Sequence, residues 1–264
     1  MCGRYVIYTA DELIDLHHIV AEAQRRADEL QNKADKDGRA AGVAGAPAPG
    51  GVSAQLSLAF IPADHESPIS AASAPSAPAA GTPASLRVKT GEVFPTNIAP
   101  VLVAGKKGPL ATFGVAESLE AHPMIWGYPQ FGGKKGVVFN TRLETAPERP
   151  FWRDSLAARR CVVPMSGFYE WQHGGPHDRQ RYLFDMPTAP VMFVAGIYKP
   201  FSSSEAALAE RFSILTTGPN DSLRDVHDRM PVILREDELE EWLYGEPLAF
   251  VDRGRIALRR HAVV

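Results

Sequence analysis

Apolar residues recur at helical spacing in three parts of the chain and at strand spacing in most of the rest. The first helical pattern follows Thr9, where Glu12 three residues later gives the spacing of a capping box, and it fades near Lys36. An amphipathic helix is also predicted over residues 235–244, and a short helix is expected over residues 151–158.

Short apolar runs bounded by Gly, Pro and Asn predict strands along the remaining chain. These strands are expected at residues 5–8, 101–103, 111–115, 161–164, 168–172, 181–185, 191–198 and 212–216. Many short strands with few helices predict an α+β fold, with a mainly antiparallel, barrel-like β core and a few flanking helices. We expect a single domain over residues 1–264.

The segment from residue 38 to 88 differs in composition from the chain on either side of it. It consists mainly of Ala, Pro, Gly and Ser and has few aromatic residues. Such a segment cannot bury enough apolar surface to offset the entropy lost on ordering, so it is predicted to be disordered. We interpret it as an insertion within the domain, because the chain before it is too short to be a domain.

Composition narrows the class of protein. With 45% hydrophobic and 22% charged residues, the chain can bury a real core. Its net charge of -3 argues mildly against a protein that coats nucleic acid, so a nucleic-acid site would be a local basic patch. Two cysteines make neither a disulfide framework nor a metal site, and no metal or organic cofactor is implied. With no bilayer-spanning run and no secretory signal in view, a cytoplasmic location is expected.

Cys2 directly follows the initiator Met, and Cys is small enough for Met1 to be removed. Removal exposes an α-amine, with a pKa of about 7.7–8.0, and a thiol, with a pKa of about 8.5, on one residue. This 1,2-aminothiol can attack an aldehyde or carbonyl twice, and the thiolate is its reactive form. The alternative is an incidental Cys beside a frayed terminus.

Two motifs carry groups that can move protons. Glu170 lies between aromatic residues in Gly-Phe-Tyr-Glu-Trp, where burial would raise its pKa and suit it to acid–base work. Strand alternation equally allows a carboxylate that faces water. His227, in His-Asp-Arg-Met-Pro, can be a proton shuttle or a salt-bridged surface residue.

Three further positions are candidates for binding. Asn140 and Arg142 are two residues apart and therefore share a face of an extended segment, where Asn can position a carbonyl or hydroxyl and Arg can meet a phosphate. Trp126 can stack on a base or fill a hydrophobic corner. Cys161, in an apolar strand, is expected to be a buried and unreactive thiol.

Taken together, seven segments resemble the SRAP family, the SOS response-associated peptidase-like proteins that process abasic sites in DNA. Each motif is weak alone, but all seven occur in the family's order, from both sides of the insertion to about residue 243. The segments are residues 1–4, 97–100, 126–129, 140–145, 160–164, 167–171 and 227–231. The sequence departs from the family pattern in its long insertion, in a short stretch at residues 130–135, and in an early C-terminus.

The resemblance implies roles for these residues. Cys2, freed of Met1, would form a covalent thiazolidine with the ring-opened sugar of an abasic site in single-stranded DNA. Asn140 would hold the Cys2 backbone or the sugar, while Glu170 and His227 would move protons. Arg4 and Arg142 would contact phosphates of the DNA, and Trp126 would line the DNA channel. The family name adds an autopeptidase or hydrolase activity that removes Met1, and a lyase activity is a further expectation.

The chemistry of the residues supports this interpretation. An amine condenses with an aldehyde to an imine, and the neighbouring thiolate then closes a five-membered ring, which removes the iminium that promotes strand breakage. We expect a monomer that contacts DNA and no membrane, and that is associated with the nucleoid when on DNA. Two alternatives are an N-terminal-nucleophile amidohydrolase, such as a glutamine amidotransferase, and a non-catalytic single-stranded DNA-binding module.

Overall fold

The computed structural model describes most of the chain outside the Ala/Pro-rich segment. The described residues are 3–8, 14–42, 86–105, 119–130, 135–172, 180–201 and 208–263. The strand expected at residues 111–115, the capping box at Thr9 and most of the expected insertion lie outside these ranges.

Five strands form a closed barrel. The order around the barrel is β12 (Glu210–Thr217), β4 (Leu119–Trp126), β3 (Ile98–Ala104), β8 (Arg160–Met165) and β11 (Met192–Pro200). The barrel closes because β11 also pairs with β12. Every neighbouring pair is antiparallel except β12 and β4, which run in parallel. The expected α+β fold with a mainly antiparallel, barrel-like core is therefore confirmed.

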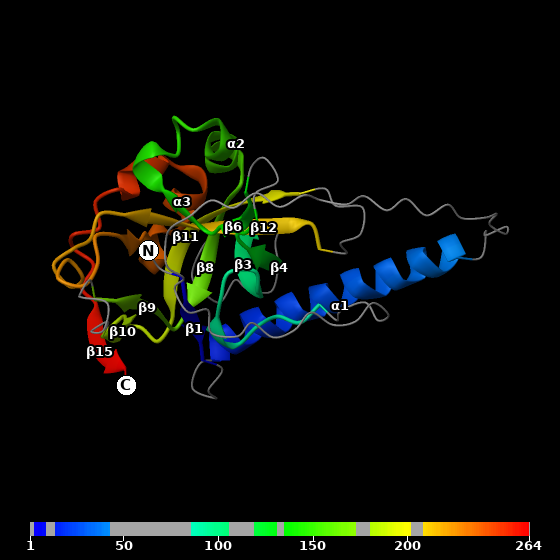
Figure 1. Cartoon of the computed structure of the whole chain (residues 1–264), viewed down its shortest axis with the longest axis horizontal. Coiled ribbons are helices and arrows are strands. Elements are labelled where there is room, and N and C mark those ends of the chain that lie inside the picture. Colours follow the sequence, from blue (N-terminus) through cyan, green and yellow to red (C-terminus); the bar gives the residue numbers. More distant parts are fainter. Residues whose placement is uncertain are drawn as a thin grey trace, which may run out of the picture.

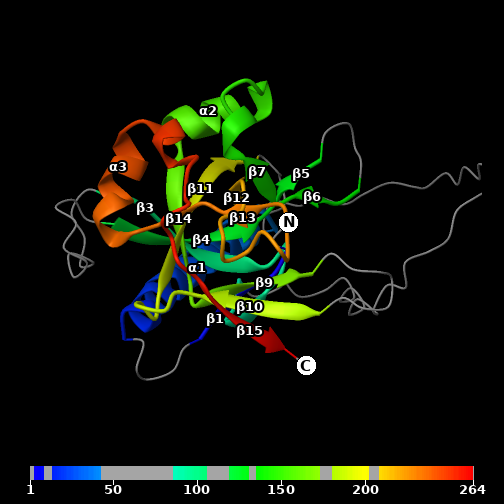
Figure 2. The same ribbon diagram turned by 90° about the vertical axis from the view of Figure 1, so that its left-hand side faces the viewer.

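A second sheet packs against one side of the barrel (Figure 2). Its strands are all antiparallel, in the order β15 (Arg259–Val263), β10 (Arg181–Asp185), β9 (Gly167–Trp171), β1 (Tyr5–Ile7) and β2 (Gly91–Val93). Tyr5 and Phe168 from this sheet share a core cluster with Val163 and Met124 of the barrel. The first residues of the chain are therefore built into the fold beside β9.

Short strands extend the barrel at one end. Both β7 (Asn140–Arg142) and β13 (Met230–Pro231) pair with β12, whereas β14 (Ile233–Leu234) pairs with β11. A separate two-stranded ribbon joins β5 (Tyr128–Pro129) to β6 (Val137–Val138). Since Thr216 has Arg142 as its partner on one side and Pro231 on the other, two of the quoted motifs meet at the end of β12.

The helices lie outside the sheets. The long helix α1 (Ile14–Gly42) packs on β3 and β4 through apolar residues spaced three or four apart, and its C-terminal half extends beyond the barrel (Figure 1). The shorter helices α2 (Pro150–Ala158) and α3 (Leu239–Tyr244) cover another face, together with the 3₁₀ turns η3 (Leu143–Thr145), η4 (Glu236–Glu238) and η5 (Pro247–Phe250). In the described part of the chain, no helix combines the length and the apolar character needed to cross a membrane.

Both ends of the expected insertion have defined structure. Residues 38–42 continue α1, which therefore runs past the predicted end of the helix. At the other end, the side-chain amide of Gln24 donates to the carbonyl oxygen of Leu86 at 3.0 Å and accepts from the backbone N–H of Val88 at 2.8 Å. These hydrogen bonds hold the chain that follows the insertion against α1.

Candidate functional site

Glu170 is a buried carboxyl group on β9. Its residue is 2% exposed, and every position of the strand from Gly167 to Glu170 is buried. The water-facing alternative therefore does not hold, because both faces of the strand are covered at this point. Burial raises the pKa of Glu170 to about 7, and the negative charge of Asp228 adds to the rise. A group with this pKa can both donate and accept a proton near neutral pH.

His227 faces Glu170 from the loop that follows β12. This loop is a tight turn, in which the backbone N–H groups of Val226 and His227 both donate to the carbonyl oxygen of Leu223, at 2.8 and 3.0 Å. The turn directs Nε2 of His227 to within 3.9 Å of Oε2 of Glu170. The histidine is 7% exposed, so the two groups meet in a largely dry environment.

The backbone of the same loop selects the tautomer of His227. The N–H of Arg229 donates to Nδ1 at 3.0 Å, which requires a lone pair on Nδ1 and leaves the proton of the neutral ring on Nε2, toward Glu170. Oδ1 of Asp228 also lies 3.0 Å from Nδ1, where it would accept a hydrogen bond from a charged imidazole. The ring therefore has a defined partner in each protonation state.

Asn140 is the first residue of β7, and its role at the site stays a prediction. The strand lies parallel to β12, with Asn140 opposite Ile214 and Arg142 opposite Thr216. Thr141 is buried, whereas Asn140 is partly exposed and Arg142 exposed, so the expected shared face of Asn140 and Arg142 is the outer one. Arg142 forms no ion pair with any residue in the described ranges, and its guanidinium is open to an anion.

A bidentate ion pair joins the two motifs on either side of β12. Nη1 and Nη2 of Arg229 donate to the two carboxylate oxygens of Glu144 at 2.9 and 2.8 Å, and Nη2 also reaches the carbonyl oxygen of Thr216 at 2.7 Å. Burial opposes the ionisation of Glu144, but the hydrogen bonds from Arg229 outweigh it and lower the pKa of that carboxyl. The pair fixes the His227 loop against the turn that follows Asn140.

The N-terminal segment runs beside Glu170. Tyr5 is opposite Phe168, and one more hydrogen bond, from the N–H of Tyr169 to the carbonyl oxygen of Arg4 at 2.9 Å, continues this register. The same register carries Gly3 to the position opposite Glu170. Cys2 itself lies outside the described residues.

The side chain of Arg4 is engaged by its neighbours. Its Nη1 donates to Oε2 of Glu92 at 3.0 Å, and the guanidinium lies 4.4 Å from the ring centre of Phe94 and 5.3 Å from that of Trp171. With a side chain about a quarter exposed, Arg4 keeps a solvent-facing edge beside two aromatic rings. The phosphate contact expected of Arg4 stays a prediction.

Trp126 is a core residue, which corrects the expectation that it lines a DNA channel. The residue is 0% exposed, and its indole N–H donates to the carbonyl oxygen of Phe139 at 2.9 Å. The rings of Tyr5, Phe139 and Phe212 pack around it. A DNA base cannot reach a ring that is enclosed in this way. Of the two interpretations of the sequence, the hydrophobic corner is the one observed.

The chain has one other cysteine besides Cys2. Cys161 is fully buried on β8, and burial raises the pKa of its thiol well above the usual value, so it is unreactive as expected.

Among the described residues, no group of three or more His, Cys, Asp or Glu side chains is arranged to hold a metal ion.

The structure thus brings Glu170 and His227 together directly, and the ion pair of Arg229 with Glu144 joins the His227 loop to the turn that follows β7. Sequence reasoning did not assign roles to Arg229 and Glu144, although both lie in quoted motifs. Their pairing joins residues far apart in the chain, and no local pattern signals such a contact.

Comparison with known proteins identifies the class to which this fold and site belong. The model of the family "SOS response associated peptidase (SRAP)" matches residues 1–251. The chain therefore belongs to the SRAP family, as the sequence motifs indicated.

Several curated relatives carry the name abasic site processing protein. YoqW of Bacillus subtilis is 35% identical over 106 residues, which cover 40% of this chain and 47% of the relative. YedK of Escherichia coli is 28% identical over 130 residues, covering 49% and 58%, and HMCES of Rattus norvegicus is 30% identical over 159 residues, covering 47% and 45%. The matched part spans about half the length of these relatives.

Two solved structures share the fold. A protein from Bacteroides thetaiotaomicron superposes with a TM-score of 0.53 at 22% identity, covering 66% of this chain and 78% of the other. A protein from Bordetella bronchiseptica gives a TM-score of 0.52 at 20% identity, covering 66% and 87%.

Proposed function

We propose that this protein processes abasic sites in single-stranded DNA by forming a covalent link through Cys2 after the removal of Met1. The observation that carries the proposal is the pairing of Glu170 and His227 opposite the N-terminal strand. Gly3 lies across from Glu170 in the strand register, and chain connectivity keeps the Cα atom of position 2 about 3.8 Å from that of Gly3. A nucleophile at position 2 is therefore tied to the neighbourhood of the acid–base pair.

The proposed reaction has two bond-forming steps. The α-amine of Cys2 adds to the aldehyde carbon of the ring-opened sugar, and loss of water gives an imine. The Cys2 thiol then adds across the C=N bond, so that sulfur bonds to carbon and the proton passes to nitrogen. The product is a thiazolidine, which no longer holds the iminium that promotes β-elimination and strand breakage.

Both steps need proton transfer. With a pKa of about 7, Glu170 has both protonation states populated near neutral pH, so it can donate to the departing hydroxyl group and accept the thiol proton. His227, with its proton on Nε2, can donate a hydrogen bond to the Glu170 carboxylate after a small closure of the 3.9 Å gap. When the ring is charged and its second proton on Nδ1 faces Asp228, it can pass the Nε2 proton to Glu170 and remain as a neutral imidazole. Asn140 and the exposed Arg142 are proposed to hold the sugar and a neighbouring phosphate.

Two finer parts of the proposal concern Met1 and the setting of the reaction. Removal of Met1 by the protein itself would use the same Cys2 thiol against the preceding carbonyl, which is the peptidase activity in the family's name. A DNA substrate agrees with a cytoplasmic protein that associates with the nucleoid.

The proposal is tested by intact-mass analysis of protein mixed with a single-stranded oligonucleotide that carries one abasic site. We expect an adduct with the abasic strand, none with the undamaged strand, and none with Cys2→Ala protein. Release of ammonia from glutamine without an adduct would favour the amidohydrolase alternative. Salt-sensitive binding that ignores both the abasic site and a Cys2→Ser change would favour a simple DNA-binding module.

A further inference from the structure

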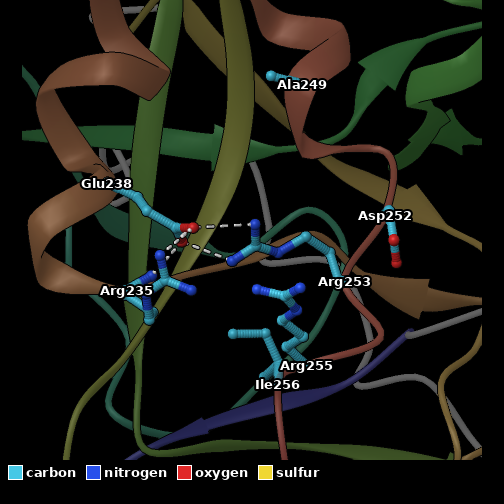
Figure 3. A pocket seen from close by; sticks show the side chains of 7 residues that line it. All are labelled: Arg235, Glu238, Ala249, Asp252, Arg253, Arg255 and Ile256. Carbon is cyan, nitrogen blue, oxygen red and sulfur yellow. Dashed lines mark hydrogen bonds and ion pairs between the residues drawn. The ribbon is translucent and has the colours of Figure 1, made fainter.

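A polar pocket lies away from Glu170, between the turn η4 and the segment that leads from η5 to β15. Its volume is about 330 Å³. Figure 3 shows the residues that line it, which are Arg235, Glu238, Ala249, Asp252, Arg253, Arg255 and Ile256. Three guanidinium groups and two carboxylates give this lining an excess of positive charge.

Carboxylates pair with two of the three arginines and leave Arg255 without an ion pair among the described residues. Glu238 accepts from Nη1 and Nη2 of Arg253 at 3.2 and 2.5 Å and pairs with Nη2 of Arg235 at 2.9 Å. Nε of Arg235 also donates to Oδ1 of Asp237 at 3.1 Å, so these two arginines are matched by two carboxylates. Asp252 lies apart from the guanidinium groups in Figure 3, and its Oδ1 accepts from the backbone N–H of Gly254 at 2.9 Å. Arg255 is exposed and forms no ion pair with any residue that the structure describes.

Arg253 supplies the observation that points to a ligand. Its side chain is only 5% exposed, and its Nε is buried without a hydrogen-bond partner among the described residues. Buried N–H groups are almost always satisfied, and a charged donor left without an acceptor is destabilising. A ligand oxygen that enters the pocket could accept a hydrogen bond from the Nε–H group of Arg253.

We propose that the pocket binds a phosphate group, held by Arg253 and Arg255 with Arg235 at the rim. The planar fork of a guanidinium matches the oxygen atoms of phosphate, and donors on separate arginines suit an anion with several oxygens. The phosphate belongs either to a nucleic-acid strand or to a free phosphate or phosphate monoester. The chemistry of recognition is the same in both cases.

The pocket is connected to the loop that carries His227. The side-chain amide of Asn220 donates to the carbonyl oxygens of Arg253 and Ile256, and its backbone N–H lies 3.3 Å from Sδ of Met230. Asn220 also begins the turn that contains His227. A bound phosphate would therefore brace one side of this loop. The inference does not depend on the crosslinking reaction, because phosphate binding is measured without an abasic site.

The test compares the wild-type protein with its Arg255→Gln variant in calorimetric titrations with inorganic phosphate. Arg255 is exposed and unpaired among the described residues, so this variant should fold, which far-UV circular dichroism verifies. Arg153→Gln is the matched control, because Arg153 is an exposed arginine on α2. We expect the Arg255→Gln change to weaken phosphate binding by about tenfold, the loss of one charge-assisted hydrogen bond, and the control to bind as the wild type does.

A second titration with an undamaged single-stranded oligonucleotide distinguishes the two sources of phosphate. If a strand phosphate occupies the pocket, Arg255→Gln lowers the slope of log K against log salt by about 1, whereas Arg153→Gln does not. If the ligand is a free phosphate, only the titration with inorganic phosphate responds. The proposal is overturned if Arg255→Gln binds both probes as the wild type does, or if wild-type protein binds neither.

Discussion

Nε2 of His227 lies 3.9 Å from Oε2 of Glu170, and the two side chains are 8% and 2% exposed. This separation is longer than a hydrogen bond, so proton exchange requires a small closure when a substrate enters. The N–H of Arg229 holds the imidazole in the tautomer that directs its proton to Glu170. Two proton carriers are thereby aligned beside the strand that begins at Tyr5.

Replacing Glu170 with Gln removes the proposed acid and base while keeping the shape of the side chain. Because general acid–base groups contribute about 10²–10⁴-fold to a rate, we expect crosslinking to slow by roughly that factor. The measurement is the time course of adduct formation by intact mass. Glu236→Gln, an exposed change on η4, serves as the control and should react at the wild-type rate. An unchanged rate in Glu170→Gln protein would remove Glu170 from the mechanism.

The stability of the folded protein should also depend on Glu170. Burial raises its pKa from the ordinary 4.5 to about 7, so between these values the folded state binds more protons than the unfolded state. The protonated Glu170 therefore stabilises the folded state, and this contribution to the free energy of unfolding is fully present below about pH 4.5 and is lost as pH rises through 7.

Comparison with Glu170→Gln isolates this effect, because glutamine does not titrate. The difference in stability between variant and wild type should move in favour of the variant from pH 5 to pH 8, by a few kcal/mol at most, at about 1.4 kcal/mol per pKa unit. Urea unfolding at several pH values measures it. A difference that stays constant with pH would mean that the carboxyl group titrates normally.

Trp126→Phe separates a core role from a DNA-binding role. The change removes the hydrogen bond to the carbonyl oxygen of Phe139 and leaves space among the surrounding rings. We expect the free energy of unfolding to fall by about 1–3 kcal/mol. Affinity for single-stranded DNA, measured by fluorescence anisotropy well below the melting temperature, should not change. A stable variant with weakened DNA binding would place the indole at the DNA after all.

Arg142 is the exposed cation of the outer face of β7. If it contacts a phosphate, Arg142→Gln should weaken binding to single-stranded DNA of any sequence and lower the slope of log K against log salt by about 1. Anisotropy titrations from low to moderate salt give this slope. Arg153→Gln, the exposed arginine on α2, should keep the wild-type slope. Equal slopes in all three proteins would exclude Arg142 from the phosphate contacts.

Local patterns predicted much of the fold. β10 was predicted with its exact bounds, and the prediction for α2 missed only its first residue, Pro150. Both are set by short-range periodicity and flanking turn residues. The closure of the barrel was not readable in detail, because β12 and β4 pair through only two residues on each strand. β15 was missed because Arg259–Val263 is mostly polar and exposed, as an edge strand can be.

The sequence identified residue types and strand positions at the site, but not which side chains are buried. The sequence placed Glu170 on a strand, but its burial depends on the sheet and the His227 loop closing over it. Trp126 looked equally suited to a base or to a corner, and only the convergence of Tyr5, Phe139 and Phe212 decides between them. Contacts between distant segments therefore determined what residue type and spacing could not.

The most direct test of the account is to find which atoms of the protein carry the sugar after reaction with abasic DNA. Trypsin cleaves after Arg4, so tandem mass spectrometry of the digested adduct should find the remnant on the peptide Cys2-Gly3-Arg4 with no Met1. Cys2→Ser protein, which keeps an amine but no thiol, should give strand breakage in place of a lasting adduct. A remnant on a lysine, or on a peptide that still begins with Met1, would contradict the account.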